Sequence, residues 1–100
     1  MNLEDFNAYV RAFAEEDYYS AGALEPSFAK FVQTEQLDTR RWVSIHRDIY
    51  QIGDDFFAVQ YQQGLTEEQD LDRSEIVLST YRVRPAERVI TFYEKVKEQD

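Results

Sequence analysis

The spacing of apolar residues changes near Arg41, and this change most constrains how the chain can fold. Before it, Leu3, Phe6, Val10 and Phe13 recur at intervals of three and four, which places them on one face of a helix. After it, apolar and polar residues alternate, as they do in strands with one buried face. Helices followed by a run of strands are typical of the α+β class.

Two helices are predicted before the change in spacing. Asn2 is a suitable N-cap for the first helix, and Gly22 is a natural stop for it. The second helix is predicted from Pro26 to Gln36, because proline is favoured at the first position of a helix. The apolar stripe of this second helix comprises Phe28, Phe31, Val32 and Leu37.

Four strands are predicted after the change, at residues 41–52, 56–62, 76–83 and 88–96. In the first of these strands the apolar side chains change face near Arg47 and Asp48, which predicts a β-bulge or a bend there. The polar connection over residues 65–74 has room for one helical turn, with Thr66 as its cap. The expected architecture is an α+β fold with two N-terminal helices packed on a four-stranded antiparallel sheet.

The length and composition indicate a single acidic domain that spans residues 1–100. A chain of 100 residues can bury one core, and a content of 43% hydrophobic and 15% aromatic residues does not fit an acidic disordered tail. No apolar run reaches the roughly 18 residues that a membrane span needs, and the acidic start lacks the features of a signal peptide. We expect a cytoplasmic protein without membrane contact, in the host cytoplasm if a phage encodes it.

The net charge of −9 arises from 11 basic and 20 acidic residues and is concentrated in two blocks. Residues 1–25 contain six acids against one arginine, and residues 54–75 contain seven acids against one arginine. Nucleic acid and anionic membranes are poor partners for such a surface, because like charges repel. The two blocks serve either to keep the protein soluble or to bind basic side chains of a partner protein.

No arrangement of residues identifies a catalytic or metal site. The chain has no cysteine and one histidine, His46, which excludes thiolate zinc sites, cysteine nucleophiles and a histidine-rich metal site within one chain. The stretch from Asp70 starts like a calcium loop, but Glu75 and Tyr81 stand where the loop needs glycine and glutamate. We expect no enzyme activity, no cofactor and no metal ion, and weak cation binding by the acidic stretch stays open.

Several tyrosines are interleaved with the acids, which is typical of surfaces that bind proteins. A tyrosine ring can pack against a partner while its hydroxyl group stays in water, although the same property suits packing within the sheet. On the first interpretation, the predicted partner-binding residues are Asp54, Asp55, Glu67, Glu68, Asp70, Asp72, Glu75 and Tyr61.

Parts of the C-terminal half resemble small acidic proteins encoded by phages and mobile elements. Residues 55–70 form an aromatic strand that ends in Gly-Leu-Thr-Glu and is followed by acids, and Val83–Pro85 and Val89–Tyr93 complete the resemblance. That class includes anti-restriction and anti-CRISPR proteins, some of which resemble DNA in charge. The resemblance implies an inhibitor of a nucleic-acid enzyme, and it transfers no site residue.

Charge and resemblance together lead us to expect inhibition by blockade. The acids would bind the basic, DNA-reading surface of a host protein, such as a CRISPR effector or another DNA-binding nuclease, without direct contact to nucleic acid. The alternative is a structural or accessory interaction module of a phage or mobile element, dimeric through a sheet edge or an aromatic face. The sequence leaves both a monomer and a homodimer open.

Overall fold

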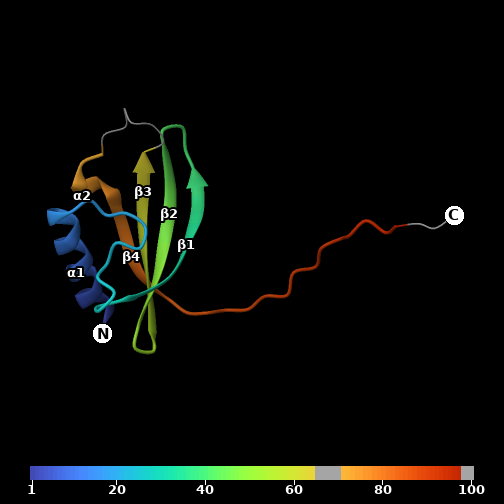
Figure 1. Cartoon of the computed structure of the whole chain (residues 1–100), viewed down its shortest axis with the longest axis horizontal. Helices are drawn as coiled ribbons and strands as arrows, with labels where there is room; N and C mark the ends of the chain where they lie inside the picture. Colours follow the sequence, from blue (N-terminus) through green and yellow to red (C-terminus); the bar gives the residue numbers. More distant parts are fainter. Residues whose placement is uncertain (65–70, 98–100) are drawn as a thin grey trace.

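The computed structural model describes residues 1–64 and 71–97, which form one long helix, a four-stranded sheet and an extended C-terminal segment (Figure 1). The sheet is antiparallel throughout, with the strand order β1-β2-β3-β4. The α+β class and the four-stranded antiparallel sheet are therefore confirmed. In chain order, the elements are α1 (Leu3–Glu16), β1 (Lys30–Thr39), β2 (Val43–Ile52), β3 (Asp55–Gly64), α2 (Arg73–Ile76) and β4 (Val77–Val83).

Helix α1 begins where the sequence predicts. The side chain of Asn2 accepts a hydrogen bond of 2.8 Å from the backbone N–H of Asp5, which satisfies one of the free donors of the first turn. The helix ends at Glu16, and the chain leaves it in an extended conformation at Asp17, five residues before the predicted stop. In the described part of the chain, no helix is long and apolar enough to cross a membrane. The buried side chains of α1 are Phe6, Val10 and Ala14.

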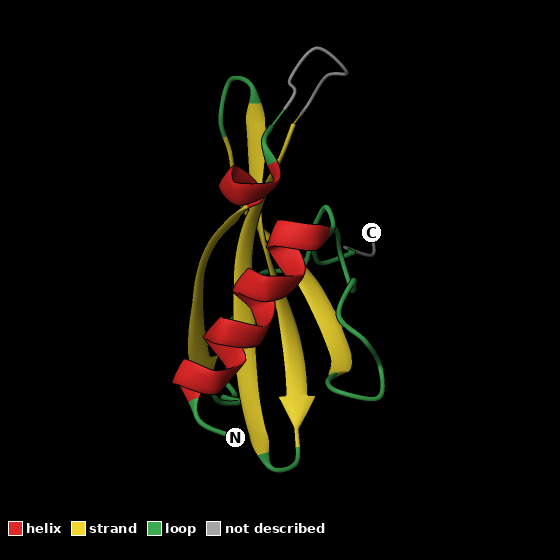
Figure 2. Ribbon diagram, turned by 90° about the vertical axis from the view of Figure 1, so that its left-hand side faces the viewer, coloured by secondary structure: helices red, strands yellow, loops and turns green. Residues whose placement is uncertain are grey.

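The core lies between the sheet and a layer that covers one of its faces. Helix α1 runs obliquely across this face (Figure 2) and packs on β3 and β4. The loop of residues 17–29 covers the same face over β2, where Tyr19 and the backbone of Leu24 contact Tyr50. The largest fully buried apolar side chains are Tyr50, Phe6, Phe57, Leu24, Val10 and Val59.

A polar ladder crosses the opposite face of the sheet and joins all four strands. Arg47 on β2 forms an ion pair with Glu35 on β1 and donates a hydrogen bond of 3.4 Å to the hydroxyl of Tyr81 on β4. Tyr81 in turn donates to the side chain of Gln60 on β3 at 3.3 Å. The hydrogen bond from Arg47 lowers the pKa of Glu35, so this pair stays charged at neutral pH.

The predicted helix over residues 26–36 is wrong, because most of that segment belongs to strand β1. β1 contains two register shifts against β2, one between Phe31 and Gln33 and one between Gln36 and Asp38. Each bulge inserts an extra residue and shifts the alternation of side chains by one position. The apolar residues of this twice-bulged strand therefore recur at intervals that imitate a helix.

The β-bulge predicted near Arg47 and Asp48 is also wrong. Strand β2 begins at Val43 and pairs with β3 without a register shift along their whole length. The apolar side chains change face because β2 is buried on both sides. Tyr50 packs under α1, while Ile45 and Ile49 are buried on the opposite face.

The predicted strand at residues 88–96 is wrong for the single chain. These residues are extended but pair with no strand among the described residues, and they lead away from the body of the molecule (Figure 1). The sheet still has four strands, because β1 replaces the strand that was expected at the C-terminal end.

One helical turn is present in the connection between β3 and β4, as the sequence allows. This turn is α2, where Asp72 and Glu75 form a capping box. Thr66, the cap that the sequence predicts, lies outside the described residues.

Candidate protein-binding surface

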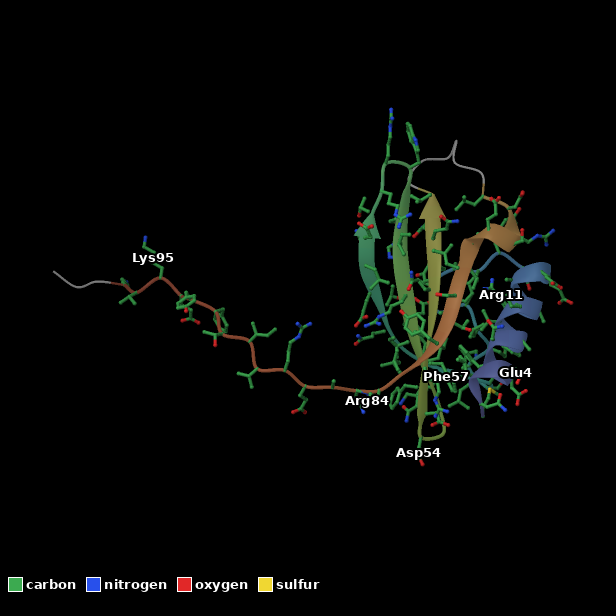
Figure 3. All side chains as sticks on the ribbon, turned by 180° about the vertical axis from the view of Figure 1, so that it is seen from behind. Glu4, Arg11, Asp54, Phe57, Arg84 and Lys95 are labelled. Atoms are coloured by element: carbon green, nitrogen blue, oxygen red, sulfur yellow. The ribbon has the colours of Figure 1, made fainter. Side chains whose placement is uncertain are left out.

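The ten-residue strand β3 separates the predicted acidic site residues into two groups. Asp54 and Asp55 lie at its start, at the tip of the β2–β3 hairpin (Figure 3). Asp72 and Glu75 lie beyond its other end, where Gln62 donates a hydrogen bond of 2.7 Å to the backbone carbonyl of Glu75. A strand rises by about 3.4 Å per residue, so about 30 Å separates the two groups. The remaining predicted acids, Glu67, Glu68 and Asp70, lie outside the described residues.

The group at the hairpin tip is partly neutralised. The carboxylate of Asp55 lies 2.6 Å from the guanidinium of Arg82 and 3.9 Å from the amino group of Met1. Asp54 is exposed at the turn, and Glu4 at the start of α1 lies at the same end of the molecule (Figure 3). This end therefore has less unpaired negative charge than its composition indicates.

The other end of the sheet collects acids from both sequence blocks. Arg73 of α2 donates a hydrogen bond of 2.8 Å to the backbone carbonyl of Glu16, which holds α2 against the C-terminal end of α1. This contact brings the last acids of α1 to the capping acids of α2. We define the acidic end as the five exposed residues Glu15, Glu16, Asp17, Asp72 and Glu75. None of these five carboxylates takes part in the ion pairs found within residues 1–64 and 71–97.

A pocket of about 490 Å³ opens beside the acidic end. Its wall contains Tyr18, which directly follows Asp17, and Ile76, which directly follows Glu75. Two residues of the acidic end are therefore sequence neighbours of residues that line an aromatic cavity, which we call the tyrosine pocket. Its main apolar and aromatic lining residues are Tyr18, Tyr19, Tyr61, Leu71 and Ile76.

Tyr18, the exposed tyrosine of the pocket lining, already lies against a guanidinium group of the chain itself. The Cζ atom of Arg73 lies 5.4 Å from the centre of the Tyr18 ring. A guanidinium within about 6 Å of a ring is attracted by the negative face of the π-system. With 61% of its surface exposed, Tyr18 has room to stack a further cationic side chain.

A buried carboxylate holds the wall of the pocket in place. Asp48 on β2 is fully buried and accepts hydrogen bonds from the hydroxyl of Tyr19 at 2.6 Å, the backbone N–H of Gly22 at 2.8 Å and the hydroxyl of Thr34 at 2.7 Å. Because the single hydroxyl proton of Tyr19 goes to Asp48, Tyr50 donates the 2.7 Å bond between the two tyrosines. Gly22 has a φ of +69°, a left-handed conformation that glycine adopts without strain.

The buried tyrosines remain protonated at neutral pH. Burial raises the pKa of Tyr50 to about 12, and it raises the pKa of Tyr19 and Tyr61 beyond the usual range, with Asp48 contributing to each increase. Among the described residues, every buried side-chain nitrogen and oxygen has a hydrogen-bond partner. The cluster therefore supports residues 17–22 with all of its buried polar atoms hydrogen-bonded.

Tyr61 occupies a different position from the one that the sequence predicts. It is 3% exposed and packs edge-to-face on Tyr19, with 5.0 Å between the ring centres. A partner could therefore contact Tyr61 only by entering the pocket that Tyr61 lines. Tyr18 is one of the tyrosines interleaved with acids but was not among the predicted site residues, although the Tyr18–Tyr19 pair directly after an acidic helix end was the available signal.

The structure offers no metal site within residues 1–64 and 71–97. No group of three or more histidine or carboxylate side chains is placed there to hold an ion. The expected lack of enzyme activity stays a prediction.

Comparisons with protein-family models, with curated proteins and with solved structures found no match. The resemblance to acidic phage proteins therefore stays an expectation from the sequence, and function has to be argued from the surface itself.

Proposed function

We propose that the protein binds a basic, arginine-bearing protein surface with its acidic end and the tyrosine pocket, and that it inhibits a nucleic-acid-binding host protein by covering that surface. The observation that carries the proposal is the proximity of five exposed carboxylates to an aromatic pocket whose exposed Tyr18 already stacks with the guanidinium of Arg73. Carboxylates alone serve solubility equally well. The adjacent pocket is what favours recognition of arginine.

The two parts of the surface have different physical tasks. Exposed carboxylates attract a basic partner over a distance of about 8–10 Å at physiological salt and increase the association rate. An arginine that stacks on Tyr18 loses water and contributes to the lifetime of the complex. Arginines that bind DNA phosphates are suited to carboxylates as well, so the protein and DNA would compete for them.

The first prediction compares two variants that each remove three charges. Glu15→Gln, Glu16→Gln and Asp17→Asn neutralise part of the acidic end, while Glu4→Gln, Asp5→Asn and Asp54→Asn neutralise the opposite end. We expect the first variant to slow association with an arginine-rich peptide by about tenfold at low salt, since steering depends on local charge. The control variant should change the rate by less than about twofold, because its charges lie about 30 Å away.

Surface plasmon resonance at low and high salt provides the measurement. The difference between the variants should shrink as salt screens the charges. Equal slowing by both variants would show that only net charge matters, and it would contradict a localised site. Tyr18→Ala tests the pocket separately, and we expect it to accelerate dissociation with little dependence on salt.

Inhibition requires a further experiment with a DNA-binding nuclease captured from a host lysate. The unmodified protein should displace DNA from this nuclease, while the variant at the acidic end should not. If the captured partner binds DNA equally well in the presence of the unmodified protein, the blockade mechanism is wrong.

The alternative function, a dimeric interaction module, is supported by a separate observation. The C-terminal segment exposes large apolar side chains along most of its length.

A further inference from the structure

The C-terminal segment, residues 84–97, has the sequence of a strand but no strand partner in the single chain. It leads away from the body, so the molecule extends over 66 Å with a radius of gyration of 17.6 Å (Figure 1). A compact domain of this length has a radius of gyration of about 13 Å. Five large apolar side chains along the segment are 68–99% exposed, namely Val89, Ile90, Phe92, Tyr93 and Val96.

The hinge directs the segment away from its own strand β4. Arg84 precedes Pro85, and a residue before proline is restricted to an extended conformation. The start of the segment borders a pocket together with Val32 of β1 and Ile49 of β2, so it crosses the sheet towards β1. The remainder continues beyond that side of the sheet (Figures 1 and 2). The segment therefore does not fold back on β4 in its own chain.

Strand β4 offers an open edge for an added strand. Its outer edge has no strand partner among the described residues. Arg11 of α1 donates hydrogen bonds to the backbone carbonyls of Val77 and Leu78 at 2.9 and 3.3 Å, so the open part of the edge begins after Leu78. A groove of about 610 Å³ lies beside this edge between α1 and β4, with Leu3 and Leu78 among its lining residues. The other edge, β1, contains two bulges and a series of charged side chains, which are features that block strand addition.

The charges of the segment and of the body are complementary. Residues 84–97 contain four lysines and arginines against two acids. Residues 1–83 contain seven lysines and arginines against 16 acids. The basic, apolar segment of one copy is therefore complementary to the acidic body and the open strand edge of a second copy of the same chain.

We propose that residues 88–96 of one copy pair with strand β4 of a second copy as a fifth strand, and that the exchange is reciprocal. Each added strand buries its apolar side chains, and its ladder satisfies the free backbone groups of β4. The segment leaves from the hairpin-tip end of the sheet, since Val83 pairs with Phe56. The acidic end stays free at the opposite end, so the dimer and the proposed inhibition are independent.

Light scattering after gel filtration of the full chain tests the dimer. We expect a mass of twice the 11.9 kDa chain. The variant Ile90→Ser with Phe92→Ser should be monomeric, and Leu78→Lys in the groove should weaken dimerisation by at least tenfold. Leu37→Ser with Trp42→Ser is the matched control, because these side chains are also exposed but lie at the β1–β2 end, and it should remain dimeric. Circular dichroism confirms that each variant is folded.

A disulfide experiment tests where the segment docks. The chain has no native cysteine, so every disulfide formed joins two introduced thiols. Chains with Thr91→Cys are mixed with chains that carry Ser79→Cys, and oxidation should link the two kinds of chain. A monomeric full chain, a dimeric Ile90→Ser, Phe92→Ser variant, or the absence of the mixed disulfide would overturn the proposal. So would a disulfide within one monomeric chain that carries both cysteines.

Discussion

At the scale of single residues, Asp48 supports the candidate surface without belonging to it. Its carboxylate joins the loop of residues 17–29 to strands β1 and β2 through Tyr19, Gly22 and Thr34. A buried carboxylate without a basic partner is expensive unless its oxygens are fully hydrogen-bonded. Here two donors from the loop and one from β1 supply these bonds, so the pocket wall depends on one side chain in the core.

The second prediction concerns the substitution Asp48→Asn. The amide presents its NH2 group to donors that now lack an acceptor, so we expect the free energy of unfolding to fall by about 2–4 kcal/mol. Urea denaturation measures this change. Asp54→Asn is the control, because this exposed carboxylate should contribute less than about 0.5 kcal/mol. Equal stability of both variants would show that Asp48 does not hold the loop.

At the scale of elements, local signals worked where the local pattern is regular. Helix α1 has a cap and an uninterrupted apolar stripe, and strands β2 and β3 pair in continuous register. Strand β1 fails because its two bulges break the alternation. Strand β1 forms because it pairs with β2, and the spacing of its own apolar residues does not indicate a strand.

The third prediction tests the cap of α1. Asn2→Ala removes the acceptor for the Asp5 backbone N–H, and the free energy of unfolding should fall by about 1 kcal/mol. Asn2→Asp keeps the acceptor and should retain the stability of the unmodified protein. Thermal unfolding monitored by circular dichroism distinguishes the two variants. A loss of stability in both would assign the effect to something other than the cap.

At the scale of the whole molecule, the fold determines where the negative charge lies on the surface, and the two acidic blocks of the sequence do not correspond to two acidic surfaces. Glu4 and Asp54 lie at one end of the sheet while Glu16 and Asp72 lie towards the other, because α1 and β3 both run along the sheet. One end is partly neutralised by Arg82 and Met1, while the acidic end has no ion pair among the described residues. The same net charge of −9 therefore produces two different surfaces.

The fourth prediction concerns stability at high pH. The unfolded chain releases tyrosine protons near pH 10, whereas burial keeps the pKa of Tyr50 at about 12 and those of Tyr19 and Tyr61 higher. Above pH 10 the unfolded state thus binds fewer protons, so stability falls as pH rises. Three tyrosines give a slope of up to about 4 kcal/mol per pH unit.

Urea denaturation at a series of pH values from 8 to 11 measures this slope. Tyr50→Phe should make the slope shallower, because it removes one of the three buried hydroxyl groups. A free energy of unfolding that stays constant through pH 11 would contradict the burial of these hydroxyl groups.

Elements whose patterns are local could be predicted from the residues alone. These are α1, strands β2, β3 and β4, the α+β class and the acidic character of the surface. Helical and alternating spacing follow from the repeat of each element alone, and net charge follows from composition.

Contacts between residues that are far apart in the chain depend on the tertiary structure. Glu16 and Arg73 are 57 positions apart in the chain, and Tyr19 and Asp48 are 29 positions apart, yet these contacts form the acidic end and the pocket wall. The fate of residues 88–96 depends in the same way on a strand edge, since a strand becomes part of a sheet only when a neighbour satisfies its backbone groups. Spacing along one chain contains no information about that neighbour.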